Sequence, residues 1–315
     1  MKKRPEKAPS HTPGQWISLD WLPRFNTQQT TAHRVYTSRS CWIERFGADF
    51  LISYKEEPDR DRLVPELLQW NRTAGLKTRR IFAKLLARTS PERDKPLLVH
   101  GDSNLSPQTT TLENGMTFGL DFSAGYSSGL FIDQRANRAE LRARPAKKLL
   151  NTFAYTCSFS VTAALDNAET VSVDLSKKSL DRGKENFTLN ALDPAKHRFI
   201  ADDVFSVLPY LQRKGETFDA MVLDPPTFSR ADKGRVFQVE RDFEKLLLLA
   251  LELAAPSARI LLSVNCHKMD ARDLENTARY AVKAARKQGT LRPGASLPDF
   301  PDYAVPITLW LDTRG

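Results

Sequence analysis

The chain has 315 residues, of which 41% are hydrophobic and 27% charged, enough for one large domain or two ordinary domains with a substantial core. Its 47 Lys and Arg residues outnumber its 38 Asp and Glu residues, and the net charge of +9 favours a polyanionic partner. No run of about 18 apolar residues is present, which excludes a membrane-spanning helix, and three widely spaced cysteines predict no metal site and a reducing, cytoplasmic location.

The first 130 residues predict a tail followed by a small α+β domain. Residues 1–32 begin MKKRPEKAPSHTPG, which is basic but lacks the apolar segment of a secretory signal, so we expect a disordered tail. Residues 33–130 contain a strand pair around Phe46-Gly47 and a helix over 61–72. They end in a hairpin at Asn114-Gly115, because this dipeptide favours a type I′ turn with positive φ at both centres.

Residues 131–315 predict a second domain in which strands alternate with helices. Strands are expected over 147–155, 170–174, 197–201, 218–224 and 258–264, helices over 160–166, 176–190, 202–213, 241–255 and 273–287, and a β segment over 304–311. Strands separated by helices of this length imply crossover connections and a parallel sheet. The predicted fold class is therefore α/β and doubly wound.

The loop after the first of these strands limits the choice of ligand. A dinucleotide-binding fold would place the pattern GxGxxG here, so that the backbone can approach a pyrophosphate. The segment FAYTCSFS, residues 153–160, contains no glycine. This argues against NAD, FAD or ATP held by a glycine-rich loop, whereas small and polar residues suit a ligand without phosphates.

Carboxylates follow the next three strands. Asp174 ends the second strand, where it can accept hydrogen bonds from ribose hydroxyls. Asp202 and Asp203 follow the third strand, where a carboxylate can meet the exocyclic amine of an adenine. Asp224 ends the fourth strand and precedes two prolines, which fix the direction in which the chain leaves the sheet. One such Asp is most often a helix N-cap, but the set along one sheet edge favours a ligand site.

Several of these segments resemble a known family. NTFAYTCSFSVTAAL, VSVDLSKKSLDRGKENFTLN, DDVFSVL and VLDPPTF resemble class I S-adenosylmethionine-dependent methyltransferases. More narrowly, the chain is similar to bacterial 23S rRNA methyltransferases of the large-subunit cytosine-5 type, which share the segment LENGMTFGLDFSAGYSSGLFIDQRANR. The resemblance covers roughly residues 40 to 311 and implies a Rossmann-like, seven-stranded methyltransferase domain behind a smaller N-terminal α+β domain.

The resemblance implies S-adenosyl-L-methionine as the cofactor and suggests which residues bind it. The methionine part would lie against the loop after the first strand, the ribose at the end of the second and the adenine at the end of the third. The DQR segment would close over the cofactor, although a salt-bridged linker remains an alternative for its arginine. The implied cofactor-binding residues are Gln134, Arg135, Tyr155, Thr156, Cys157, Ser158, Asp174, Leu175, Asp203, Val204, Asp224 and Pro225. The family usually has glycine where this chain has Cys157 and Ser158.

The chemistry of cytosine C5 requires a nucleophile. C5 becomes electron-rich when a thiolate attacks C6, which is covalent catalysis. By resemblance Cys266 occupies the nucleophile position, and Asp224 would face the target base as its catalytic partner. A buried, inert cysteine is the alternative. In a related branch the same Asp-Pro-Pro loop serves a purine N-methyltransferase without a catalytic cysteine.

Basic residues suggest where RNA would bind. Two basic stretches, around residues 72–88 and 135–148, predict phosphate contacts, with a solvated helix face as the alternative. The candidate RNA-binding residues are Arg72, Lys77, Arg79, Arg80, Arg138 and Arg142. Phe131 and Phe228 are candidates for stacking on a base that leaves its stack.

The leading interpretation is therefore an RNA methyltransferase that acts on ribosomal RNA at cytosine C5. The alternatives are a purine N-methyltransferase or small-molecule methyltransferase of the same fold, and a non-catalytic RNA-binding protein.

Overall fold

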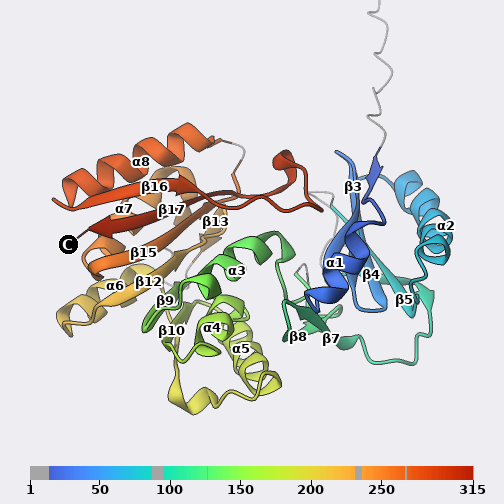
Figure 1. Ribbon diagram of the computed structural model, residues 1–315, viewed down its shortest axis with the longest axis horizontal. Helices are drawn as coiled ribbons and strands as arrows, with labels where there is room; N and C mark the ends of the chain where they lie inside the picture. The colour runs from blue at the N-terminus through green and yellow to red at the C-terminus, as the bar shows by residue number, and fades with distance from the viewer. Residues whose placement is uncertain (1–13, 87–94, 126, 231–235, 267, 315) are drawn as a thin grey trace, which may run out of the picture. The chain divides into compact units, whose positions relative to one another are not determined.

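A computed structural model describes residues 14–86, 95–125, 127–230, 236–266 and 268–314 (Figure 1). The described residues fall into two compact units. Unit 1 runs to Leu112 and includes Asp121–Ser128, and unit 2 comprises Glu113–Leu120 and the chain from Gly129 onward. The sequence predicted a single boundary at residue 130, whereas in the structure residues 113–120 group with unit 2. The assignment of these units as domains remains a proposal.

Unit 1 is built on one six-stranded sheet in the order β1 to β6. Its strands are β1 Gln15–Trp16, β2 Ala32–Thr37, β3 Cys41–Phe46, β4 Asp49–Tyr54, β5 Arg80–Leu85 and β6 Leu97–Gly101. The pairing is antiparallel except between β4 and β5, because helix α2, Glu57–Thr73, makes the crossover between them. The strand pair predicted around Phe46-Gly47 is present as β3 and β4.

The expectation of a disordered tail up to residue 32 is wrong for residues 14–32. These residues include β1 and helix α1, Trp21–Thr27, whose Leu22 and Phe25 are buried. Phe25 also stacks on His33, with ring centroids 4.4 Å apart. A short apolar face at helical spacing packs this segment against the rest of unit 1. The pattern covers too few residues to be recognised in the sequence among the polar residues that surround it.

The chain passes from unit 1 to unit 2 within a two-stranded sheet of β7, Gln108–Glu113, and β8, Met116–Asp121. Asn114 has φ of 49° and Gly115 has φ of 77°. Both central residues therefore adopt the left-handed conformation that the type I′ prediction required.

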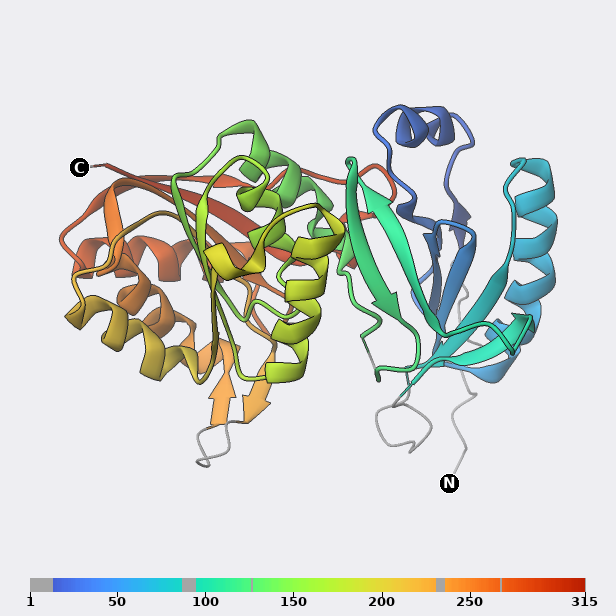
Figure 2. The ribbon, with the colours of Figure 1, turned by 90° about the horizontal axis from the view of Figure 1, so that it is seen from below.

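Unit 2 contains a seven-stranded sheet in the order β11-β10-β9-β12-β15-β17-β16 (Figure 2). The strands are β9 Lys148–Thr152, β10 Glu169–Asp174, β11 Arg198–Ala201, β12 Phe218–Leu223, β15 Ala254–Val264, β16 Gln288–Pro293 and β17 Ile307–Arg314. The first five in sheet order are parallel, and β17 is antiparallel to both neighbours. The strand order reverses between β9 and β12, which is the switch point where doubly wound folds bind ligands.

Helices cover both faces of this sheet (Figure 1). They are α3 Arg135–Ala143, α4 Ser158–Ala164, α5 Lys177–Leu189, α6 Val204–Arg213, α7 Val239–Leu251 and α8 Ala271–Ala284, with short 3₁₀ turns η2 Ile132–Gln134, η3 Pro194–Lys196 and η4 Asp302–Ala304. Alternate strand residues supply the two cores. Leu149 and Val222 pack toward α3 and α4, and Leu150 and Met221 pack toward α6, α7 and α8. The doubly wound, seven-stranded fold is therefore confirmed.

Strands β13, Phe228–Arg230, and β14, Val236–Gln238, form a separate two-stranded sheet that extends from unit 2 (Figure 2). This hairpin, helix α3 and strand β16 were not expected from the sequence. Among the described residues, no helix is long and apolar enough to cross a membrane.

Candidate active site

The parallel strands of unit 2 end at the same level. Thr152 on β9 pairs with Val173 on β10 and with Leu223 on β12, and Asp174 pairs with Ala201 on β11. The loops that carry the predicted site residues therefore leave one edge of the sheet on both sides of the switch point. This arrangement is the geometry expected of a ligand site in an open α/β sheet.

The glycine-free loop after β9 adopts a conformation that usually requires glycine. Phe153, Tyr155 and Cys157 have φ of 51°, 48° and 61°, which are left-handed values. The loop is held by the Tyr155 backbone N–H, which donates to Asp174 Oδ2 at 2.8 Å, and by Thr156 Oγ1, which donates to the Gly129 carbonyl at 2.6 Å. A strained backbone conformation persists only where surrounding contacts hold it in place. Such conformations are most common at functional sites.

The side chain of Cys157 packs away from the ligand edge, against helix α5. A Cβ placed on Gly183 would lie 2.5 Å from the Cys157 sulfur, so glycine at this helical position makes room for the thiol. Burial raises the pKa of the Cys157 thiol to about 12, so it stays protonated at neutral pH. Any contact of Cys157 with a ligand therefore comes from its backbone. The neighbouring Ser158 hydroxyl accepts a hydrogen bond from Arg138 at 3.2 Å.

Asp174 is oriented by two backbone donors. Its Oδ2 accepts from Tyr155 N and its Oδ1 from Ser176 N, both at 2.8 Å. Burial raises the pKa of this carboxyl, and the two backbone hydrogen bonds act in the opposite direction. Carboxylate oxygens have further lone pairs, which suits the predicted contact with ribose hydroxyls. Leu175 follows it and is 40% exposed.

Asp203 caps helix α6, because its Oδ1 accepts a hydrogen bond from Phe205 N at 3.1 Å. The next residue, Val204, is buried. The structure thus gives Asp203 the cap that a single Asp after a strand most often forms, and its contact with adenine stays a prediction.

Gln134 reaches the end of β12. Its Nε2 donates to Asp224 Oδ2 at 3.1 Å and to Ser263 Oγ at 2.8 Å. Burial raises the pKa of Asp224, while Ser263, Arg138 and Gln134 act to lower it. Ser263 was not predicted from the sequence, because a serine inside an apolar strand has no distinctive spacing. Its position beside Asp224 follows from the register in which Leu223 pairs with Leu262.

Arg135 forms a buried ion pair with Asp299, with Nη1 3.2 Å from Oδ2. This is the salt-bridged linker that the sequence left open as an alternative. On the other side of Asp224, Pro225 is buried and Thr227 Oγ1 donates to the Asn265 carbonyl at 2.6 Å. The Asp-Pro-Pro loop is therefore tied to the segment that carries Cys266.

Cys266 is half-buried and packs partly against the core on the α7 and α8 face. Its sulfur lies 4.0 Å from Glu240 Oε2, and Glu240 Oε1 accepts a hydrogen bond from Lys268 Nζ at 2.9 Å. The predicted nucleophile thus lies near the same sheet edge as Asp224, with a carboxylate as its neighbour. His267, which the sequence suggested as a source of positive potential, lies outside the described residues.

Two predicted RNA contacts are contradicted by the structure. Arg80 is 1% exposed and pairs with Asp49, and Arg138 is fully buried and pairs with Glu113 through two hydrogen bonds of 2.6 and 2.7 Å. A guanidinium held by a carboxylate inside a core cannot reach a phosphate. These arginines were predicted from composition alone, which does not reveal burial.

The other RNA candidates are accessible to different degrees. Arg72, Lys77 and Arg79 are exposed on unit 1, although Arg79 also contacts Asp49. Arg142 is half-exposed and lies 3.5 Å from Asp166. The stacking candidates are about half exposed, Phe131 at 49% and Phe228 at 52%.

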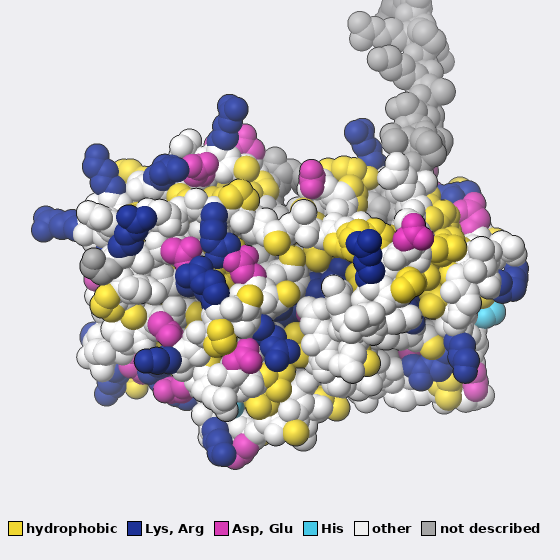
Figure 3. All heavy atoms as spheres, in the orientation of Figure 1, with side chains coloured by type: hydrophobic (Ala, Val, Ile, Leu, Met, Phe, Trp, Pro, Cys, Tyr) yellow, Lys and Arg dark blue, Asp and Glu magenta, His cyan; other side chains and the backbone are white. Residues whose placement is uncertain are grey.

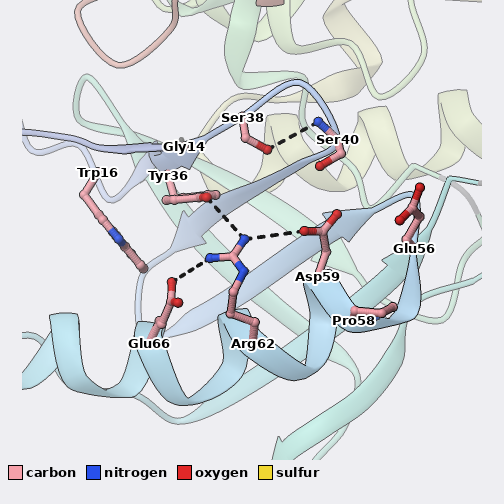
Figure 4. Close-up of a pocket in the computed structure, with 10 residues that line it drawn as sticks. All are labelled: Gly14, Trp16, Tyr36, Ser38, Ser40, Glu56, Pro58, Asp59, Arg62 and Glu66. Atoms are coloured by element: carbon pink, nitrogen blue, oxygen red, sulfur yellow. Dashed lines mark hydrogen bonds and ion pairs between the residues drawn. The ribbon is translucent and has the colours of Figure 1, made fainter. Parts of the chain in front are cut away.

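A pocket of about 600 Å³ lies wholly within unit 1 (Figure 4). Trp16 and Tyr36 line it together with charged residues of α2. Arg62 donates to the Tyr36 hydroxyl at 3.4 Å, to Asp59 at 3.4 Å and to Glu66 at 2.9 Å. Because its charged groups satisfy one another and it includes none of the predicted site residues, this pocket is not the candidate active site.

Comparison with known proteins decides the family. The model of the family described as S-adenosylmethionine-dependent methyltransferase matches residues 101–308. The chain belongs to this family. S-adenosylmethionine is therefore its cofactor, and the strand edge of unit 2 fits it, because Asp174 presents fixed acceptor oxygens beside a loop without a phosphate cradle. Within the described residues, no group of three or more His, Cys, Asp or Glu side chains is arranged to hold a metal ion.

Similar proteins include ribosomal RNA large subunit methyltransferases I. The one from Tolumonas auensis is 34% identical over 288 residues, which cover 87% of this chain and 71% of the relative. The one from Aeromonas salmonicida is 37% identical over 176 residues, which cover 55% of this chain and 44% of the relative, so this match spans less than half of that relative's length. The crystal structure of SMU.776 complexed with SAH (S-adenosylhomocysteine) is similar at TM-score 0.80 and 26% identity, covering 93% of this chain and 78% of that one.

Proposed function

We propose that this methyltransferase transfers a methyl group from S-adenosylmethionine to RNA of the large ribosomal subunit, at C5 of a cytosine, and does so in the cytoplasm. The observation that carries the proposal is the placement of Asp174 and Asp224 on either side of the switch point. Asp174 holds the loop after β9, and Asp224 stands at the end of the adjacent β12 with Gln134 and Ser263 around it. The names of the relatives support ribosomal RNA as the substrate.

The chemistry assigns a task to each residue. When bound, S-adenosylmethionine supplies an electrophilic methyl group. The Cys266 thiolate would add to C6 of the cytosine, and the electron pair of the C5–C6 double bond would make C5 nucleophilic. The C5–methyl bond would then form as the bond between that methyl group and the cofactor's sulfur breaks. Asp224 holds the base by accepting from its exocyclic amine. A base then removes the C5 proton, the C6–S bond breaks, and the thiolate is regenerated.

The accessible aromatic residues suit the delivery of a base to this edge. Phe131 lies 5.4 Å, between ring centroids, from Tyr155 of the strained loop, and Phe228 begins the β13–β14 hairpin that follows the Asp-Pro-Pro segment. Exposed rings beside a candidate site can stack on an unstacked base, and such stacking contributes about 1–3 kcal/mol for each base.

A second candidate is methylation of a purine nitrogen. The observation that favours it is the packing of Cys266. Its side chain is half-buried and packs partly against the core on the α7 and α8 face, as an inert cysteine would, whereas an Asp-Pro-Pro loop that accepts from an exocyclic amine needs no thiol. A small-molecule substrate or a non-catalytic role in RNA binding has no comparable observation in its favour.

The substitution Cys266→Ala separates the two chemistries. If Cys266 is the nucleophile, turnover of ribosomal RNA falls by about a hundredfold or more, and the affinity for S-adenosylmethionine stays unchanged. Cys41→Ala is the control, because Cys41 lies in the core of unit 1. Retention of turnover in Cys266→Ala would favour the purine reaction, and failure of the wild type to bind the cofactor would favour the non-catalytic role.

A further inference from the structure

A chain of three hydrogen bonds leads from the core of unit 2 to Asp224, and a fourth branches from it to Ser263. Trp310 Nε1 donates to Asn137 Oδ1 at 3.1 Å, and Asn137 Nδ2 donates to Gln134 Oε1 at 2.8 Å. Gln134 Nε2 then donates to Asp224 Oδ2 at 3.1 Å and to Ser263 Oγ at 2.8 Å. These five residues come from β17, α3, η2, the end of β12 and β15, and we call Trp310, Asn137 and Gln134 the amide relay.

The relay has a fixed direction. An indole N–H can only donate, so it sets the Asn137 oxygen toward Trp310 and the Asn137 nitrogen toward Gln134. The same reasoning then sets the Gln134 oxygen toward Asn137 and its nitrogen toward Asp224. Turning either amide over would bring donor against donor and leave buried groups unpaired, which costs about 1–3 kcal/mol each. Asp224 therefore always faces a donor.

The start of the relay is firmly held. Trp310 is fully buried, with the guanidinium carbons of Arg259 and Arg292 lying 5.1 and 5.6 Å from its ring centroid. Arg259 also donates to the Leu141 carbonyl at 3.3 Å and so holds the end of α3.

Glycine leaves space for the second member of the relay. A Cβ on Gly294 would lie 2.9 Å from Asn137 Oδ1, so a larger residue there would press on the Asn137 amide.

We propose that Gln134, oriented by Asn137 and Trp310, is a positioning residue that fixes the Asp224 carboxylate for the target base. The relay occupies Oδ2, so that the other oxygen, Oδ1, is turned to the exocyclic amine of the substrate. This inference rests on the proposed function, since it assigns Asp224 to the target base. The inference extends the proposed function by naming residues that act through Asp224 without touching the substrate.

The test uses neutral substitutions of similar size in the 315-residue chain. Gln134→Met removes the donor to Asp224, and Asn137→Leu removes the group that orients Gln134. Asn151→Leu is the matched control, because Asn151 is a buried asparagine of the same unit whose Nδ2 donates to Ser160 Oγ at 2.9 Å, outside the relay. Thermal unfolding reports the general cost of each substitution.

Two readouts distinguish positioning from a structural role. We expect kcat for RNA methylation to fall by about tenfold to a hundredfold in both relay variants, with KM for RNA within about twofold of the wild type. Cofactor affinity should also stay within about twofold in Asn137→Leu, because Asn137 is not among the implied cofactor-binding residues. We also expect the pKa of Asp224, measured by carbon NMR of labelled aspartate, to rise in both, because the donor to the carboxylate is lost in Gln134→Met and is no longer held in orientation in Asn137→Leu. Arg138, whose charge also acts on Asp224, is unchanged throughout.

The proposal is overturned if the relay variants differ from the wild type only in melting temperature, or if either kcat or the pKa of Asp224 stays at the wild-type value. A change in kcat in Asn151→Leu as large as that in Asn137→Leu would also overturn it. If the wild type does not methylate RNA, the proposed function has failed, and the pKa of Asp224 in the two relay variants alone decides whether the relay orients this carboxylate.

Discussion

Asp224 is the central residue of the proposed site, and in its ionised form it lowers the stability of the folded protein. Burial raises the pKa of its carboxyl, so the ionised form destabilises the folded state. Gln134 and Ser263 reduce this cost without removing it. A destabilised group retained at a ligand edge is typical of a residue that serves function rather than stability.

The substitution Asp224→Asn should therefore stabilise the protein while it abolishes turnover. Because the pKa of Asp224 is raised on folding, stability falls as pH rises through the interval between the unfolded and folded pKa values, and the whole penalty is present above it. We expect the free energy of unfolding at pH 7 to be higher in Asp224→Asn than in the wild type, because the neutral amide does not incur this penalty. Urea unfolding across pH checks this. The gain should vanish at low pH, and a destabilised variant at pH 7 would contradict the argument.

At the residue level the sequence predicted the strand-end carboxylates well, because a strand followed by Asp is a local pattern. It failed for Arg80 and Arg138, whose partners Asp49 and Glu113 lie 31 and 25 residues away in the chain. Long-range ion pairs have no local signature, so buried and solvent-exposed arginines look alike. Gln134 was predicted only through the family resemblance, and its contact with Asp224 required the fold.

At the scale of elements, the loop after β9 and helix α5 have complementary packing. The loop is left-handed at Cys157, and α5 has glycine at position 183 where the thiol packs. The family usually has glycine in this loop. Here a side chain occupies the loop, and the glycine in the helix leaves space for it.

We expect Gly183→Ala to destabilise the protein by up to about 2 kcal/mol. Alanine normally stabilises a helix interior by about 1 kcal/mol over glycine, but the new methyl group would lie 2.5 Å from the Cys157 sulfur, and overpacking costs about 1–3 kcal/mol. The double variant Cys157→Gly with Gly183→Ala should recover most of this loss. Chemical denaturation measures both, and a stable Gly183→Ala single variant would show that the packing is not tight.

Strands and helices of the sheet were largely predictable, because buried parallel strands read as short apolar runs between amphipathic helices. Helix α3 was missed because Arg135–Ala143 has a low mean hydropathy: it contains three arginines, and Leu141 is its one large apolar residue. Strand β16 was missed because QGTLRP contains glycine and proline, and only its pairing with β17 makes it a strand.

At the scale of the whole molecule, charge is the remaining evidence for RNA. The net charge is +9, yet on the face shown in Figure 3 the Lys and Arg side chains lie scattered among acidic ones. Because no continuous basic patch is visible among the described residues on this face, we propose particular exposed cations as the RNA contacts. Arg72 and Lys77 are such residues, since both are exposed.

Replacing Arg72 and Lys77 by glutamine should weaken RNA binding and its salt dependence together. Each phosphate contact with single-stranded nucleic acid contributes about 0.7 to the slope of log affinity against log salt, so the slope should fall by about 1.4. Lys177 and Arg279 are exposed cations of unit 2 and serve as the control pair when replaced by glutamine. An equal effect in the control pair would mean that net charge alone determines binding.

The most direct test of the proposed function is to incubate the protein with labelled S-adenosylmethionine and ribosomal RNA from a strain that lacks this gene, and to identify the labelled nucleoside after digestion. We predict 5-methylcytidine from the large-subunit RNA, with no label in reactions that contain Asp224→Asn. A labelled purine would contradict the assignment of Cys266, and the absence of label from any RNA, with cofactor binding intact, would contradict ribosomal RNA as the substrate.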